Sequence, residues 1–184
     1  MHTKGTFFIG RKSYICEAFG EARWDAFLTR LAAADPVFAR PILATTLVPS
    51  ESYTRFQDAL VKEFFDGDEQ GYWITGEKAG EWALTEGPYK AFRAAGMEKL
   101  PLLVANLPKI WDAYFDDARL VATLKDGAVD VRIEGLPVSH ISLELTVMGF
   151  GEKAIELCTG KTPRTERLTG VKSGHKDIHY RFYV

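Results

Sequence analysis

Hydrophobic residues recur every three or four positions through residues 1–117, which is the spacing of one buried face of an α-helix. Trp24, Phe27 and Leu31 form one such stripe, and Pro36 follows them as a helix breaker. From this pattern and its glycine and proline boundaries, helices are predicted over 11–19, 21–33, 51–66, 68–85, 88–95 and 103–115. The first two thirds of the chain are therefore predicted to be helical.

Short local signals refine this helical part. Residues 6–9, TFFI, are predicted to form an extended segment before the first helix. Ser50 is predicted to cap the helix that follows it, because a serine side chain can accept from the first free N–H groups. Glycine is costly inside a helix, so glycines repeated at helical spacing predict a close approach to a neighbouring element. The predicted helix 68–85 has three of them: Gly71, Gly76 and Gly80.

Beyond residue 118 the hydrophobic residues alternate, which is typical of strands with one buried face. Asp126-Gly127 lies between two alternating runs and is a strong signal for a hairpin turn. A short helix is predicted over 150–159. Strands are predicted over 120–124, 129–133, 141–147, 164–171 and 177–184. The polar face of the third strand is predicted to carry His140, Ser142, Glu144 and Thr146.

Helices first and strands afterwards predict an α+β fold. The N-terminal helical part, 1–117, is predicted to pack on a C-terminal antiparallel sheet, 118–184, of four or five strands with one inserted helix. With 184 residues, 46% of them hydrophobic, the chain can bury one sizeable core. A single domain over 1–184 is therefore predicted.

Charge and targeting signals narrow the classes of function. The net charge of −2 gives no overall positive field for nucleic acid, and the basic run 161–181 is interpreted as a solvated sheet face. No stretch approaches the about 20 apolar residues of a membrane span, and no secretory signal is visible. Cys16 and Cys158 are interpreted as reduced and buried, which predicts a cytoplasmic protein.

Candidate catalytic and metal chemistry is sparse. On a strand His175 and His179 would lie about 13 Å apart, too far to share one metal ion, so no metal site is predicted. Residues 149–154 fit a dinucleotide fingerprint locally, but no repeated βα units precede them. Gly149 and Gly151 are therefore interpreted as shaping a turn from strand to helix. No nucleophile beside a base stands out, so no catalytic residue is predicted.

Aromatic residues are concentrated in the helices between Tyr72 and Phe115. Such residues at helical spacing often form core, and they can also line a cavity for a flat or apolar small molecule. Both interpretations stay open at the level of the sequence. The hypothetical ligand pocket consists of Trp73, Trp82, Phe92, Leu107, Trp111, Tyr114 and Phe115.

Lys4-Gly5, Phe19-Gly20-Glu21 and Trp24 occur in an order that resembles the opening of heme-nitric oxide/oxygen binding (H-NOX) domains. The segment 149–160, with its flanking strands, resembles the 4-vinyl reductase domain and related subunits of Golgi transport (TRAPP) complexes. Of the usual cysteine and histidine cluster of the 4-vinyl reductase domain, only Cys158 has a counterpart. The whole chain is similar to a heme-free family of this superfamily, expanded in myxobacteria and without an assigned function.

The segment 92–115 resembles the helix that carries the proximal heme histidine in H-NOX domains, and the position of that histidine falls at Trp111. A tryptophan indole offers iron no usable lone pair. The tyrosine, serine and arginine that bind the heme propionates in the family have no counterpart in 119–135. The resemblance therefore implies the fold and argues against heme, and no cofactor is expected.

The predicted function is that of a non-catalytic sensor or adaptor module that binds a small apolar ligand between helices and sheet, without heme. The first alternative is a protein-interaction scaffold, a homodimer without a small ligand, because relatives in this superfamily commonly pair through the fold. The second alternative is an enzyme, which would need a polar cluster in the pocket that the sequence does not identify.

Overall fold

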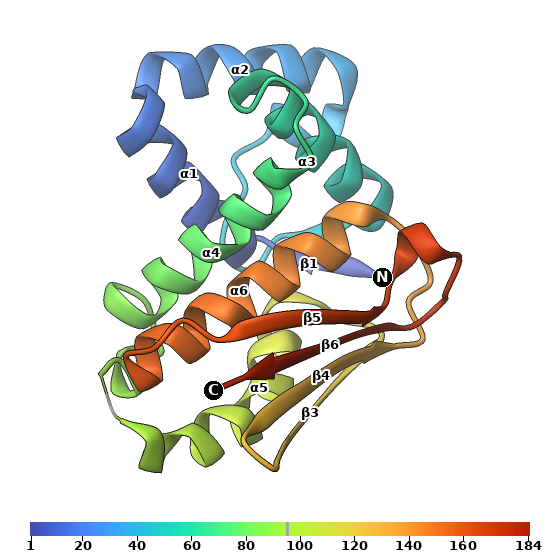
Figure 1. Ribbon diagram of the computed structural model, residues 1–184. Helices are drawn as coiled ribbons and strands as arrows, with labels where there is room; N and C mark the ends of the chain where they lie inside the picture. Colours follow the sequence, from blue (N-terminus) through green and yellow to red (C-terminus); the bar gives the residue numbers. More distant parts are fainter. Residues whose placement is uncertain (95) are drawn as a thin grey trace.

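The computed structural model describes residues 1–94 and 96–184 and has the predicted α+β fold (Figure 1). The α-helices are α1 Thr6–Phe19, α2 Glu21–Ala34, α3 Ser50–Phe64, α4 Gln70–Thr85, α5 Leu100–Tyr114 and α6 Ile141–Thr159. The strands are β1 His2–Lys4, β2 Leu47–Pro49, β3 Arg119–Lys125, β4 Ala128–Glu134, β5 Arg164–Thr169 and β6 Ile178–Tyr183. Short 3-10 helices are η1 Pro36–Ala39, η2 Lys90–Phe92, η3 Met97–Lys99 and η4 Val171–Ser173.

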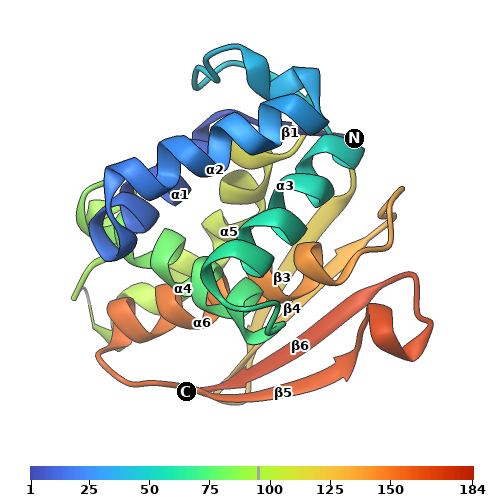
Figure 2. The same ribbon diagram turned by 90° about the horizontal axis from the view of Figure 1, so that it is seen from above.

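The larger sheet has the strand order β3-β4-β6-β5, and all neighbouring strands are antiparallel. Asp126 and Gly127 connect β3 to β4 as predicted, both with positive φ, the conformation that a tight hairpin turn requires. Val129, Val131 and Ile133 alternate with more exposed residues and are buried. Figure 2 shows the α-helices on one side of this sheet. The buried apolar residues of β4 therefore face the helices.

Helices α4 and α6 pack backbone against backbone. A Cβ atom built on Gly76 would lie within 3.0 Å of the carbonyl oxygen of Thr146, and one on Gly80 within 3.0 Å of that of Phe150. Gly149, on α6, is as close to the carbonyl oxygen of Trp73. The close approach predicted for the glycines of α4 is confirmed for Gly76 and Gly80, which approach α6, whereas Gly71 lies against the side chain of Phe65.

Residues 141–147 form the first part of α6, so the predicted strand is wrong. The alternation of Ile141, Leu143 and Leu145 suggested a half-buried strand, but the polar residues between them are buried as well. A helix that is covered on several sides loses the contrast between a polar and an apolar face. The predicted solvent face fails for the same reason, since the relative exposures of Ser142, Glu144 and Thr146 are 0%, 0% and 3%.

The buried carboxylate of Glu144 connects α6 to the last two strands. Its Oε1 accepts from Tyr180 Oη at 2.7 Å and lies 2.6 Å from Arg167 Nε. Its Oε2 accepts from the backbone N–H of Val171 at 2.6 Å, in the connection between β5 and β6. Burial of the charge is thus matched by an ion pair and two hydrogen bonds.

Several other local predictions need correction. Residues 6–9 are the first turn of α1, and the extended segment is the preceding β1. Ser50 is the first residue of α3 and makes no side-chain cap; its hydroxyl donates to the carbonyl oxygen of Met1 at 2.5 Å. The helix predicted over 88–95 is reduced to the single turn η2, and its end at Ala95 lies outside the described residues.

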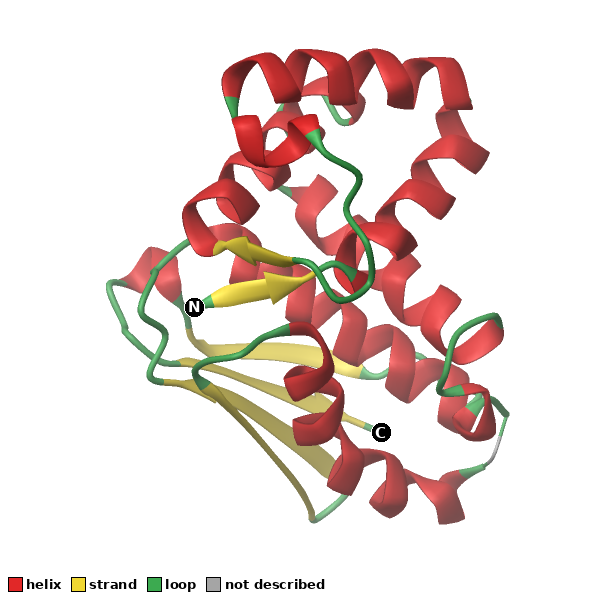
Figure 3. Cartoon of the chain, turned by 180° about the vertical axis from the view of Figure 1, so that it is seen from behind, coloured by secondary structure: helices red, strands yellow, loops and turns green. Residues whose placement is uncertain are grey.

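The N-terminal strand β1 contacts both the helical part of the chain and the segment that leads from α5 to the larger sheet. β1 pairs with β2, and Thr3 bridges to Phe115, just after α5. Figure 3 shows the small β1-β2 sheet between the N-terminal helices and the larger sheet. No helix in the described part of the chain is long and apolar enough to cross a membrane.

Candidate functional site

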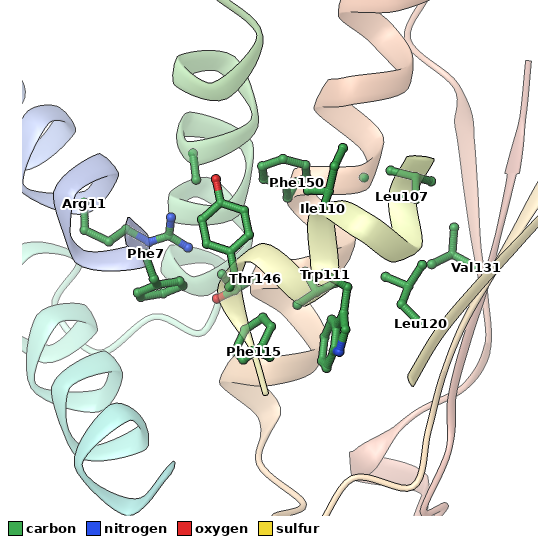
Figure 4. Close-up of a pocket in the computed structure, with 14 residues that line it drawn as sticks. Phe7, Arg11, Leu107, Ile110, Trp111, Phe115, Leu120, Val131, Thr146 and Phe150 are labelled. Carbon is green, nitrogen blue, oxygen red and sulfur yellow. The ribbon is translucent and has the colours of Figure 1, made fainter. Parts of the chain in front are cut away.

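An apolar cavity of about 50 Å³ lies where α1, α4, α5 and α6 meet the larger sheet (Figure 4). Its walls come from segments far apart in the sequence. They are Phe7, Arg11, Ala79, Leu107, Ile110, Trp111, Tyr114, Phe115, Leu120, Val131, Thr146, Val147, Phe150 and Gly151.

Helices α5 and α6 each supply four residues of the cavity wall, and those of α5 are aligned by helical spacing. Trp111 stacks on Phe115, with 4.3 Å between ring centroids and 30° between ring planes. The Trp111 indole Nε1 donates to the carbonyl oxygen of Asp117 at 3.2 Å, which fixes the ring. The aromatic wall is therefore held in place both by stacking and by a hydrogen bond.

Besides the phenol of Tyr114, two polar side chains reach the mostly apolar wall. Thr146 is satisfied within the protein: its hydroxyl accepts from Gln57 Nε2 at 2.9 Å and donates to the carbonyl oxygen of Tyr72 at 3.3 Å. Arg11 is 2% exposed, and its guanidinium carbon lies 4.0 Å from the centroid of the Phe7 ring. Thr146 therefore has no free donor, whereas the guanidinium presents its donors among aromatic rings.

Ionisable groups at the cavity respond to burial. Burial lowers the pKa of Arg11 to about 10, which leaves the guanidinium charged at neutral pH. Burial also raises the pKa of Tyr114 to about 12, so this phenol is neutral. The cavity thus holds one positive charge among neutral groups.

Four of the seven residues predicted for the pocket line this cavity: Leu107, Trp111, Tyr114 and Phe115. The other three lie elsewhere. Trp73 donates from Nε1 to Glu152 Oε2 at 2.9 Å, Trp82 lines a separate polar groove beside Tyr14, and Phe92 lies on η2. The aromatic residues between Tyr72 and Phe115 therefore lie in different parts of the fold.

The sequence analysis missed the contributions of α1 and α6. Phe7 and Arg11 are four residues apart, which is helical spacing, but the extended interpretation of 6–9 concealed this relation. Val147 and Phe150 were missed because 141–147 was predicted to be a strand. A helix predicted over 6–9 and over 141–147 would have placed these side chains on an interior face.

The remaining candidates for chemistry have structural roles. His140 Nδ1 accepts from the backbone N–H of Ser142 at 3.2 Å at the start of α6. His179 Nε2 lies 2.7 Å from Asp130 Oδ1 on the neighbouring strand. Gly149 and Gly151 lie inside α6, so the predicted turn from strand to helix is wrong. Within the described residues, no group of three His, Cys, Asp or Glu side chains is placed to hold a metal ion.

Comparison with known proteins identifies the fold of this chain but no closely related sequence. No protein-family model and no curated protein matches the chain. Among solved structures it is similar to an Fe(II) unliganded H-NOX mutant from K. algicida (TM-score 0.68, 11% identity, 98% of this chain and 95% of that chain). An H-NOX protein from S. oneidensis in the Fe(II)NO state matches with TM-score 0.66 and 11% identity over 97% of both chains. A point mutant of the H-NOX protein from T. tengcongensis matches with TM-score 0.66 and 15% identity over 98% of this chain and 96% of that chain.

The residues of the cavity do not fit a heme. A pocket for a drug-sized ligand takes about 300–1,000 Å³, whereas this cavity has about 50 Å³. No histidine or cysteine is among the lining residues. Tyr114 is the one residue type there that can ligate iron, and its raised pKa disfavours the phenolate. The chain therefore has the fold of H-NOX domains, with a cavity that is too small for heme.

Proposed function

We propose that the protein is a non-catalytic sensor or adaptor module that binds a small apolar molecule in this cavity, without heme. The observation that carries the proposal is the convergence of Leu107, Trp111 and Phe150 with residues of β3 and β4 on one apolar cavity. Apolar walls such as these favour small apolar molecules. The H-NOX fold supports this proposal, because the S. oneidensis protein of that fold holds a diatomic ligand.

A ligand in this cavity would touch elements that connect it to the surface. Helix α6 contributes Val147 and Phe150 to the cavity wall and, through Glu144, holds the connection between β5 and β6. A change in the position of α6 on binding therefore has a direct route to that exposed connection. Such a displacement is what a sensor module needs to report occupancy.

Xenon is expected to bind the cavity of the purified protein and to shift the indole ¹H–¹⁵N resonance of Trp111 in a saturable way. Xenon is small, apolar and able to enter dry cavities of this kind. The resonance of Trp24, which is buried in the aromatic cluster of α2 away from the cavity, is expected to stay in place. Equal shifts of both tryptophans, or none, would count against the proposed cavity ligand.

A matched pair of variants locates the site. Ala79 lines the cavity on α4, so Ala79→Val is expected to weaken xenon binding several-fold by filling part of the space. Ala59, on α3, is partly buried outside the cavity wall, so Ala59→Val is the control and is expected to leave binding unchanged. If both variants had the same effect, the bound xenon would lie elsewhere.

Hemin added to the purified protein is expected to produce no Soret band of a ligated heme. Trp111 provides no lone pair for iron. Its ring forms part of the cavity wall, and the cavity would have to be larger to hold a heme. An H-NOX protein such as the one from S. oneidensis, treated identically, is the positive control. A saturable Soret band at one heme per chain would refute the heme-free part of the proposal.

The scaffold alternative has one observation in its favour. Leu43 and Leu47, before and on β2, are 65% and 52% exposed. The same xenon titration distinguishes the two functions, because a scaffold without a ligand site gives no saturable response. Four expectations from the sequence stay predictions. They are the enzyme alternative, the homodimer, the cytoplasmic location, and the kinship with 4-vinyl reductase, TRAPP and myxobacterial relatives.

A further inference from the structure

Arg11 is a charged side chain that has no charged partner among the described residues. Its Nε atom is buried and makes no hydrogen bond, and no ion pair is found for its guanidinium within the described residues. The side chain is 2% exposed and points from α1 into the cavity of Figure 4, beside Phe7. A buried guanidinium normally pairs with a carboxylate or a phosphate, because its transfer from water is otherwise very unfavourable.

The neighbouring groups only partly compensate this charge. The Phe7 ring provides a cation–π contact at 4.0 Å on one side of the guanidinium. The titratable groups that interact with Arg11 are the phenols of Tyr53 and Tyr114, and burial raises the pKa of both, so both are neutral at pH 7. Neutral phenols leave most of the positive charge of the guanidinium without compensation.

Buried carboxylates of the surrounding helices are already paired elsewhere. Asp35 pairs with Arg55, and Glu144 pairs with Arg167 on β5. In the part of the chain that the structure describes, Arg11 therefore faces an apolar cavity and no anion. An anion from outside the chain fits this arrangement better than a neutral molecule does.

We propose that the cavity takes a small monocarboxylate, whose carboxylate pairs with Arg11 and whose short apolar chain lies against Trp111 and Phe150. This inference rests on the proposed function and names the class of its ligand. The planar guanidinium matches a carboxylate in a two-pronged hydrogen-bonded pair, and Arg11 keeps donors free for it. The cavity of about 50 Å³ restricts the chain to a few carbon atoms unless the walls move.

The test compares three probes of similar size: butyrate, butyramide and 1-butanol. Each is titrated into the full chain at pH 7 while the Trp111 indole resonance and the Tm are followed. Wild-type protein is expected to bind butyrate at least tenfold more tightly than either neutral probe. In Arg11→Met this order is expected to reverse, because the charge partner is gone and the apolar wall remains.

Two further variants keep the test decisive. Arg11→Lys preserves the charge but not the planar fork, so it is expected to retain a reduced preference for butyrate even if Arg11→Met does not fold. Lys12→Met removes an exposed charge on the same helix and is expected to leave the preference unchanged. A loss of preference in Lys12→Met would attribute the effect to surface charge and overturn the assignment to Arg11.

The outcomes separate the two proposals. If the neutral probes bind at the cavity as well as butyrate does, the monocarboxylate inference is wrong and the apolar-ligand function stands. If no probe and no xenon atom binds there, both fail. If butyrate binds with the same affinity to wild type and to Arg11→Met, the carboxylate site lies elsewhere.

Discussion

Replacing Glu144 by alanine is expected to lower the free energy of unfolding by about 3–5 kcal/mol, the usual cost of removing one partner from a buried ion pair. The carboxylate is fully buried and serves Arg167, Tyr180 and the backbone of Val171 together. Its removal leaves the Tyr180 hydroxyl and the Val171 N–H without their acceptor. Arg167 is one third exposed, so it can turn to solvent and reduce the loss toward the lower end of that range.

Urea denaturation of three variants checks this expectation. Glu144→Gln keeps the shape of the side chain but not its charge, so it is expected to lie between wild type and Glu144→Ala. Glu17→Ala on α1 is the control, because Glu17 is exposed and such changes usually stay within about 0.5 kcal/mol. A loss for Glu144→Ala no larger than that of the control would show that the network contributes little.

Gly76→Ala is expected to destabilise the protein by more than about 3 kcal/mol, at or beyond the upper end of the range for overpacking. The added Cβ would lie within 3.0 Å of the carbonyl oxygen of Thr146, a backbone atom that cannot move without α6. Alanine has the higher helix propensity by about 1 kcal/mol, so propensity alone predicts the opposite sign. Thermal unfolding followed by circular dichroism gives the sign directly.

Gly10→Ala is the matched control, since Gly10 is also buried inside a helix. Its Cβ would meet the Trp82 ring at 3.6 Å, which is an ordinary contact. This variant is expected to be neutral or to gain up to about 1 kcal/mol from helix propensity. If Gly76→Ala were as stable as Gly10→Ala, α4 and α6 could not be as close as the structure places them.

The elements predicted correctly from the sequence are those whose signal is local. The hairpin at Asp126-Gly127 depends on the backbone freedom of its two residues, and strand β4 has one buried face that alternation reveals. The first part of helix α6 escaped prediction because its polar residues are satisfied by partners far along the chain, whereas its second part, 150–159, was predicted as a helix. Glu144 meets Arg167 on β5, and Thr146 meets Gln57 on α3, and no local pattern contains this information.

The residues of the candidate site show the same difference between local signals and contacts that are distant in sequence. The face of α5 could be predicted, because Leu107, Trp111 and Tyr114 follow helical spacing. Arg11 could not, since a charged residue is assigned to the surface unless its surroundings are known. Arg11 shares the cavity wall with residues of α4, α5 and α6, so the most informative residue of the cavity emerges only from the tertiary structure.

The contact between α4 and α6 through Gly76 and Gly149 has a mechanical consequence. With backbone against backbone, the pair has no layer of side chains between its axes that could deform. The two helices should therefore move as one stiff body, and compliance in this part of the fold should be concentrated along α5, which lines the cavity without belonging to that pair. Hydrogen exchange on the protein with and without a cavity ligand would then slow in α5 and remain nearly constant in the α4–α6 pair.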